Sequence, residues 1–364
     1  MKKSSAPNER IKRDYIIWLK EAKGRNEASI DGVAKALNRF ETYSKFRDFK
    51  KFHIEQARGF KAYLAEQRNE RTSEPLSAAT LYSTLSALKA FFKWLADKPG
   101  YKSCISHADA EYFNLSEKEA RVATAHRGKH SPTIEQILHV LESMPVQSDV
   151  EKRNRALIAF TLLTGARDGA TASFKLKHID LVAGKIEQDA REVNTKRSKT
   201  FTTCFFPVGD VVREIVVDWV NFLRNEKLWG NDDPLFPATA MRNGADRRFE
   251  VVGLARKHWS NATAIRNIFK QAFTTAGLPY FNPHSFRNTL AQLAYKLRLG
   301  PEQFKVWSQN LGHESVLTTF SSYGEVSAYR QAEIMRNLAE TSGDGSHGED
   351  VLNAISKLLA RNRR

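Results

Sequence analysis

The chain has little cysteine and no long apolar run. Its 364 residues include two cysteines, Cys104 and Cys204, and no Cys-x-x-Cys pair. Two isolated cysteines provide neither a disulfide framework nor the ligands of a structural zinc site. No stretch reaches the roughly 20 apolar residues of a membrane helix, and the basic start lacks the apolar segment of a signal peptide. We therefore expect a reducing cytoplasm, no membrane-spanning segment and no structural zinc site.

Acidic residues are outnumbered by basic ones. The chain has 57 Lys and Arg against 41 Asp and Glu, which gives a net charge of +16 and a pI of about 9.7. Charges of one sign repel each other in a compact fold. An excess of this size therefore indicates a polyanionic partner. Nucleic acid is the first candidate and an acidic membrane surface is the second. The length predicts about two domains.

Residues 9–98 predict a small four-helix domain with a basic surface. Apolar residues recur there at helical spacing in four segments, and Ser77 is placed to cap the fourth. Pro99-Gly100 should end that helix. Residues 99–130 lack a long apolar stripe and are basic, so we expect an interdomain linker with one short helix. Such a linker could follow a phosphate backbone or simply act as a spacer.

Residues 131–340 predict a second, α+β domain that is mostly helical. Thr133 and Gln136 form a capping box at its first helix. Two alternating segments predict one small antiparallel sheet, with a polar hairpin tip at 194–199. Residues 229–260 are expected to be irregular. The expected helices cover 134–144, 152–163, 211–225, 261–276, 284–299, 301–310 and 327–338, and the expected strands cover 185–191 and 201–208.

Residues 341–364 predict a flexible tether followed by a short terminal helix. The tether is rich in Gly and Ser, and the helix has an apolar stripe from Val351 to Leu359. A tethered stripe of this kind can dock on a neighbouring subunit or on its own domain, and both alternatives stay open.

Four cations stand in segments where they could meet an anion. His284 and Arg287 follow Pro283 in the first turn of a helix, about 90° or more from its apolar stripe, so we expect them to face a cleft. Arg167 lies in a turn between glycines, where it could bind two phosphate oxygens. Lys196 occupies the hairpin tip beside Arg197 and Lys199. Each of these, taken alone, is more simply explained as a surface charge or a cap.

A Gly-His pair and a tyrosine complete the pattern. His313 precedes Tyr323 by ten positions, and Thr318, Thr319, Ser321 and Ser322 between them could bind phosphate or cap a helix. The order Arg, Lys, His-x-x-Arg, Gly-His, Tyr resembles the tyrosine recombinase (phage integrase) family over nearly the whole chain. The segments that carry the resemblance are LTGAR at 163–167, TK at 195–196, HSFR at 284–287, LGH at 311–313 and Tyr323.

The resemblance implies a fold and a chemistry. Residues 9–98 would be the core-binding domain and 131–340 the catalytic domain. Tyr323 would attack a DNA phosphodiester to form a 3′-phosphotyrosyl link, while Arg167 and Arg287 neutralise the charge of the transition state. Neither metal nor ATP would be needed.

The other family positions imply roles in proton transfer and phosphate binding. Lys196 would protonate the departing 5′-oxygen, His284 would assist proton transfer, and His313 would hydrogen-bond the scissile phosphate. Two departures stand out. The acidic residue often found three positions after the first arginine is Ala170 here, with Asp168 as a candidate substitute, and the His–Tyr spacing is one residue longer than usual. Tyr329 is a rival nucleophile by residue type.

The expected function is a site-specific recombinase or integrase that serves a mobile element by integration or excision. The resemblance implies double-stranded DNA as substrate, a homotetramer on paired sites with exchange of the C-terminal helix, and DNA-bending or directionality factors as possible partners, in a bacterial-type cytoplasm at the nucleoid. A type IB topoisomerase-like enzyme is one alternative, against which the helical first domain and the tail argue. A catalytically silent DNA-binding protein is the other, against which the intact residue set argues.

Overall fold

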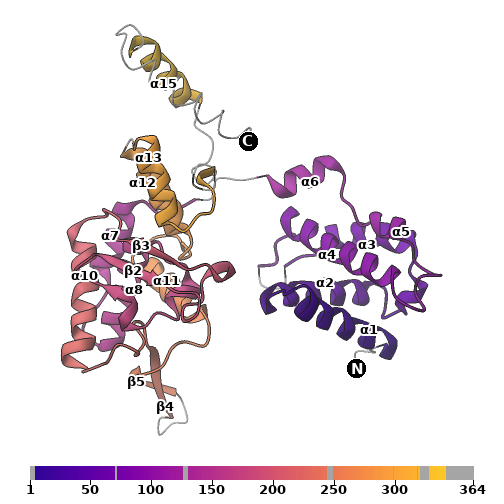
Figure 1. Cartoon of the computed structure of the whole chain (residues 1–364), viewed down its shortest axis with the longest axis horizontal. Helices are drawn as coiled ribbons and strands as arrows, with labels where there is room; N and C mark the ends of the chain where they lie inside the picture. Colours follow the sequence, from indigo (N-terminus) through magenta and orange to yellow (C-terminus); the bar gives the residue numbers. More distant parts are fainter. Residues whose placement is uncertain are drawn as a thin grey trace. The chain divides into compact units, whose positions relative to one another are not determined.

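The computed structural model describes residues 5–69, 72–125, 130–243, 249–297, 299–317, 319 and 328–341. The chain divides into two compact units, Met1–His126 and Arg127–Arg364 (Figure 1). Each unit has its own hydrophobic core. Among the helices that the structure describes, none is long and apolar enough to cross a membrane.

Unit 1 is helical, as predicted. Ser77 caps the fourth long helix by accepting a hydrogen bond from the Thr80 amide, which fixes the start of that helix where the sequence placed it. The helices are α1 (Ala6–Ile17), extended by a π-helical turn at Trp18–Ala22, α2 (Glu27–Tyr43), α3 (Ile54–Glu66), α4 (Ala78–Ala96), α5 (His107–Glu111) and α6 (Glu117–Thr124).

The core of unit 1 is aromatic, and it includes part of the predicted linker. The Phe40 ring lies 5.2 Å from Phe60, 5.3 Å from Phe92 and 5.7 Å from Phe113, measured between centroids. Phe113, like Tyr101, is buried in this core although it follows Pro99-Gly100. The expectation that 99–130 is only a linker is therefore wrong for its first part. Its apolar residues anchor turns and short helices, so they form no stripe that periodicity could detect.

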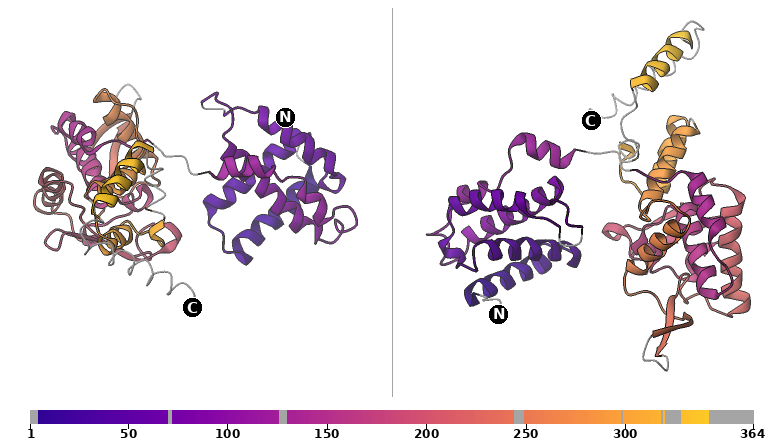
Figure 2. Two further views of the ribbon diagram at one scale, coloured as in Figure 1. Left: turned by 90° about the horizontal axis from the view of Figure 1, so that it is seen from above. Right: turned by 180° about the vertical axis from the view of Figure 1, so that it is seen from behind.

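Unit 2 is built around a central helix, α8, which is buried from Ala156 to Thr164. Helices α7, α10 and α12 pack against it. Figure 2 gives two further views of the ribbon. The predicted Thr133–Gln136 capping box is present at α7. The helices are α7 (Ile134–Ser143), α8 (Asp149–Thr164), α9 (Asp168–Thr171), α10 (Asp210–Asn221), α11 (Thr263–Thr275), α12 (Ser285–Lys296), α13 (Pro301–Asn310) and α15 (Ala328–Thr341).

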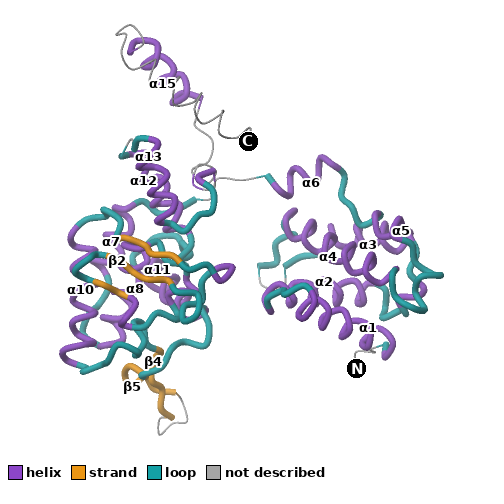
Figure 3. The backbone as a smooth tube through the Cα atoms, viewed as in Figure 1, coloured by secondary structure: helices purple, strands orange, loops and turns teal. Residues whose placement is uncertain are grey.

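Unit 2 has two antiparallel sheets among its described residues, where one was predicted (Figure 3). The predicted sheet is three-stranded, with β1 (Ile179–Asp180), β2 (Lys185–Gln188) and β3 (Phe201–Cys204) in that order. The second pairs β4 (Ala238–Asn243) with β5 (Phe249–Ala255), inside the segment expected to be irregular. A bulge at Ala240/Met241 and mostly exposed side chains removed the alternation that marks a half-buried strand.

Candidate active site

Arg287, in the first turn of α12, hydrogen-bonds the segments that meet at the site. Its Nη1 donates to the Gly165 carbonyl at 2.6 Å, and its Nη2 donates to the Leu311 carbonyl and to His313 Nε2, the latter at 2.9 Å. The side chain is only 5% exposed. The expectation that it faces a cleft from the outside of its helix is therefore wrong. Residues Ser285 to Ala291 are all buried, so this end of α12 has no exposed side on which Arg287 could lie.

Arg167 follows the end of α8 and lies beside Arg287. Helix α8 ends at Gly165, whose φ of 59° is left-handed, and a Cβ there would lie 3.0 Å from Leu290 and Leu311 side-chain atoms. Arg167 then stands at the N-cap position of α9 without a capping hydrogen bond from its side chain. It is partly buried, and burial lowers its pKa. Burial, and next the charge of Arg167, lower the pKa of Arg287 to about 9. Arg287 thus stays charged at pH 7, and two arginines close enough to influence each other favour a bound anion.

The turn that carries His313 requires glycine before it. Gly312 has φ 69°, and a Cβ at this position would lie 2.5 Å from the Phe201 ring on β3. No side chain fits there without moving the ring or the turn. Gly312 therefore brings the backbone of the turn against the sheet and sets the place of His313.

Asn310, the last residue of α13, binds the end of that helix to the same strand, β3. The Asn310 side chain accepts from the Cys204 amide at 2.6 Å and donates to the Cys204 carbonyl at 2.8 Å. Thr203 Oγ1 donates to the Asn310 carbonyl at 2.9 Å. The end of α13 thus occupies the free edge of β3 in place of a further strand.

His313 is neutral at physiological pH. Burial lowers its pKa to about 3, and electrostatic interactions with Arg287, Arg167, His284 and Lys199 lower it further, in that order. Lys199 lines the same pocket as Arg167 and His313. His284 itself is exposed at the N-cap position of α12.

Lys196 lines the same pocket as Arg167 and His313. It begins a tight turn between β2 and β3 in which Arg197 has φ 60° and Ser198 has φ 52°. Arg197 pairs with Glu314 at 3.1 Å, so the turn is tied to the segment after His313. The residues that line the pocket are Arg167, Lys196, Arg197, Lys199, Phe201, Gly312, His313 and Glu314.

The loop before Lys196 is anchored by a carboxylate. Glu192 accepts from Lys177 Nζ at 2.7 Å and lies 2.9 Å from His178 Nε2. These hydrogen bonds, Lys177 first, lower the pKa of Glu192 to about 2. The loop is therefore held to the start of the sheet by a carboxylate that remains charged at neutral pH.

Asp168 does not stand in for the missing acid. Its Oδ2 accepts from Arg266 Nε on α11 at 2.8 Å, and its Oδ1 accepts from the Gly169 amide. Ala170, at the position where an acid was expected, is packed in the core at 1% exposure. The two arginines of the site thus have no carboxylate partner among the described residues.

Thr319 is buried beside His313 and is not exposed to a phosphate or placed as a helix cap. It was a candidate for phosphate binding or helix capping, but it is fully buried and lies 2.7 Å from His313 Nδ1. Its hydroxyl donates to Ser308 Oγ at 2.8 Å. Ser308 gave no sequence signal, since serine is common on helices for other reasons. Tyr323 and residues 342–364 lie outside the described residues, and only the backbone of Tyr329 is described, within α15.

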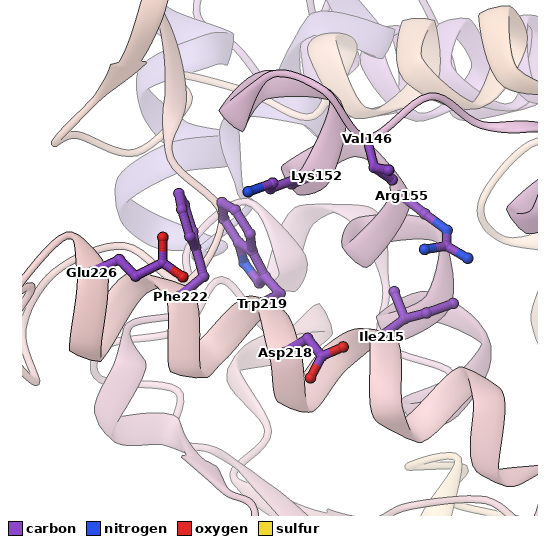
Figure 4. A pocket seen from close by; sticks show the side chains of 8 residues that line it. All are labelled: Val146, Lys152, Arg155, Ile215, Asp218, Trp219, Phe222 and Glu226. Carbon is purple, nitrogen blue, oxygen red and sulfur yellow. The ribbon is translucent and has the colours of Figure 1, made fainter.

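A second hollow in unit 2 lies between α8 and α10, away from these residues (Figure 4). Its lining mixes Lys152 and Arg155 with Asp218, Glu226 and two aromatic rings. The Lys152 ammonium lies 4.7 Å above the Phe222 ring. This hollow shares no residue with the Arg167–His313 pocket, and its charged lining residues are two basic and two acidic, whereas the Arg167–His313 pocket has four Lys and Arg residues against Glu314 alone.

Comparison with known proteins gives one consistent result. The model of the phage integrase family matches residues 130–330. The tyrosine recombinase XerC of Lactobacillus leichmannii is 24% identical over 298 residues, 71% of this chain and 90% of the relative. XerC of Lactobacillus delbrueckii subsp. bulgaricus is 25% identical over 253 residues, 68% of this chain and 72% of the relative.

Solved structures share the fold. A lambda integrase dimer bound to a COC′ core site has a TM-score of 0.58 at 16% identity, covering 89% of this chain and 80% of that one. The XerH recombinase bound to palindromic difH substrate has a TM-score of 0.57 at 18% identity, covering 88% and 82%. Because the family model covers more than half of the chain, the chain belongs to the phage integrase family, the tyrosine recombinases that cut and rejoin DNA.

Proposed function

We propose that this recombinase integrates or excises a mobile DNA element at specific sites in double-stranded DNA, with Tyr323 as its nucleophile. The observation that supports the proposal most is the pocket in which Arg167 and His313 meet Lys196, with Arg287 directly behind them. A phosphodiester is the anion that such a set of donors fits, since two guanidinium groups can bind its non-bridging oxygens.

The chemistry exchanges one phosphodiester bond for another. The Tyr323 oxygen attacks the phosphorus, the bond to the 5′-oxygen breaks, and Lys196 supplies the proton that this oxygen takes up. Arg167 and Arg287 stabilise the charge that grows on the phosphate oxygens. His284 assists removal of the tyrosine proton, and His313 donates a hydrogen bond to the phosphate. Attack by a 5′-hydroxyl reverses the steps and releases Tyr323.

The same proposal extends to assembly. A tetramer on paired sites would exchange strands one pair at a time, with residues 341–364 of each chain docked on a neighbour. DNA-bending or directionality factors would join it in the cytoplasm at the nucleoid. The apolar stripe at 351–359 supports this arrangement, since it needs a surface to cover it.

A suicide substrate tests the nucleophile. On a nicked duplex that carries the element's own end, the full chain should form a protein–DNA adduct that survives denaturation. Tyr323→Phe should form none, because it lacks the attacking oxygen. Tyr329→Phe is the matched control and should form the adduct as the wild type does.

Two results would contradict the proposal. An adduct formed by Tyr323→Phe would assign the nucleophile to another residue. Specific binding of the wild type without any adduct would instead indicate a DNA-binding protein that does not cut.

A further inference from the structure

The hydrogen bonds around His313 determine which of its ring nitrogens carries the proton. Arg287 can only donate, so His313 Nε2, 2.9 Å from Arg287 Nη2, must accept and carry no hydrogen. A neutral imidazole then has its hydrogen on Nδ1, which faces Thr319 Oγ1 at 2.7 Å. The ring is neutral because its pKa is about 3.

The hydroxyl of Thr319 is oriented to receive that hydrogen. It has a single proton, which it donates to Ser308 Oγ at 2.8 Å, so towards His313 it can only accept. Thr319 is fully buried and Ser308 is 1% exposed, and no water competes for hydrogen bonds to groups buried so deeply. The order of donation is therefore Arg287 to His313, His313 to Thr319, and Thr319 to Ser308.

We propose that Thr319, held by Ser308, is a positioning residue that fixes the tautomer and orientation of His313 and, through it, the guanidinium of Arg287. The inference rests on the roles proposed above for His313 and Arg287. It adds that the free enzyme keeps His313 Nε2 as an acceptor. In the free enzyme the ring therefore holds Arg287. To donate to a bound phosphate it must take up a proton from solvent at Nε2, while Nδ1 keeps its hydrogen bond to Thr319.

The same series of hydrogen bonds also explains how the Arg287 guanidinium stays aligned. Three acceptors hold its two terminal nitrogens, the carbonyls of Gly165 and Leu311 and the ring of His313. The two carbonyls belong to rigid element ends, whereas the ring can rotate. Thr319 removes that freedom because a second bond, on the opposite side of the ring, fixes its plane.

The first test measures the tautomer directly in the full-length, DNA-free protein. With ¹⁵N-labelled histidine, NMR should assign the hydrogen of His313 to Nδ1 in the wild type. Thr319→Val keeps the side-chain shape but loses the acceptor that holds the ring against Arg287. A population in which the ring has turned away from Arg287, with the hydrogen on Nε2, should therefore appear. Thr319→Ser keeps the hydroxyl and should restore the wild-type spectrum.

The second test measures cleavage and binding separately. Thr319→Val should slow adduct formation about 10- to 100-fold, the usual cost of a slightly misplaced catalytic group, with little change in DNA affinity. Thr319→Ser should recover most of the rate. Thr161→Val is the control, since Thr161 is equally buried and its hydroxyl bonds only to Leu157 in its own helix.

The outcomes separate this inference from the proposed function. A wild-type spectrum with the hydrogen on Nε2 would overturn the inference whether or not the protein cuts DNA. Unchanged tautomer and rate in Thr319→Val would overturn it as well. If the wild type shows the hydrogen on Nδ1 but never forms an adduct, the proposed function fails while the tautomer assignment stands.

Discussion

At the scale of single residues, the site is defined by buried positive charge. Burying a guanidinium costs free energy unless hydrogen bonds replace its water, and Arg287 receives them from two carbonyls and a ring nitrogen. Its Nε has no hydrogen-bond partner within the described part of the chain. The residue is therefore held in place before substrate arrives, which is what stabilisation of a transition state requires.

The choice between Lys196 and Lys199 as proton donor is also made at this scale, since both line the pocket. Replacing the 5′-bridging oxygen of the DNA by sulfur creates a leaving group that needs no proton. Lys196→Ala should slow cleavage of the normal substrate about 10²- to 10⁴-fold, as expected for loss of a general acid, yet cleave the sulfur substrate at nearly the wild-type rate.

Lys199→Ala is the matched variant for this experiment. If Lys199 only contributes charge, its loss should slow cleavage of both substrates alike. Rescue by sulfur in Lys199→Ala, with none in Lys196→Ala, would move the proton donor to Lys199.

At the scale of elements, the site depends on how α13 ends. Asn310 fastens that end to β3, and Gly312 lets the following turn lie against the Phe201 ring. Two features thus bring His313 to Arg287: the left-handed backbone of Gly312, and the Asn310 side chain, which binds the edge of β3 where a further strand would pair. Neither of them supplies a reacting group, yet each determines where a catalytic side chain lies.

Gly312→Ala separates steric contact from backbone strain. Gly277 has nearly the same φ, 72°, with no atom within 4 Å of a Cβ built on it. Gly277→Ala should therefore cost only the strain of a left-handed alanine, about 1–2 kcal/mol in the free energy of unfolding, with normal adduct formation.

Gly312→Ala should carry the same strain and also displace the turn from Phe201. Adduct formation should fall about 100-fold or more, because His313 and Arg287 separate. Thermal unfolding and suicide-substrate cleavage, measured on both variants, check this. Equal cleavage by the two variants would show that the contact with Phe201 does not position the site.

At the scale of the whole molecule, the excess positive charge is divided equally between the two units. Residues 1–126 contain 24 Lys and Arg against 16 Asp and Glu, and the remaining residues contain 33 against 25. Each unit thus has an excess of eight. If DNA lies against both, both contribute contacts to phosphates.

Binding by the full-length Tyr323→Phe variant should therefore depend steeply on salt. A protein that neutralises about 6–10 phosphates loses roughly 10³–10⁵ in affinity between 50 and 200 mM salt, and we expect a loss within this range. Titration of a labelled duplex at several KCl concentrations measures it. A slope equivalent to only about two or three phosphates would mean that one unit stays away from the DNA.

Much of this could be predicted from the sequence, for identifiable reasons. Helix α13 has the predicted bounds, and α7 begins at the predicted cap, because Pro301 and Thr133 are local signals. Arg167, Lys196 and His313 were found through residue type and order, and the structure places them at one pocket. What could not be predicted depends on long-range packing. The burial of Arg287 follows from α8 and α13 covering its helix, and the contact of Thr319 with His313 follows from the fold of the turn.

The hydrogen bond between Arg287 and the Gly165 carbonyl also bears on when the site can assemble during protein synthesis. Its partners are 122 positions apart, and those of the Cys204–Asn310 pair are 106 apart. During synthesis the ribosome therefore releases Arg167 and Lys196 long before the segment that aligns them. A nascent chain that ends before Asn310 has several of the cations but no assembled site. Such distant contacts form late and slowly, so we expect a chain that is only partly made to leave the DNA that its charge attracts uncut.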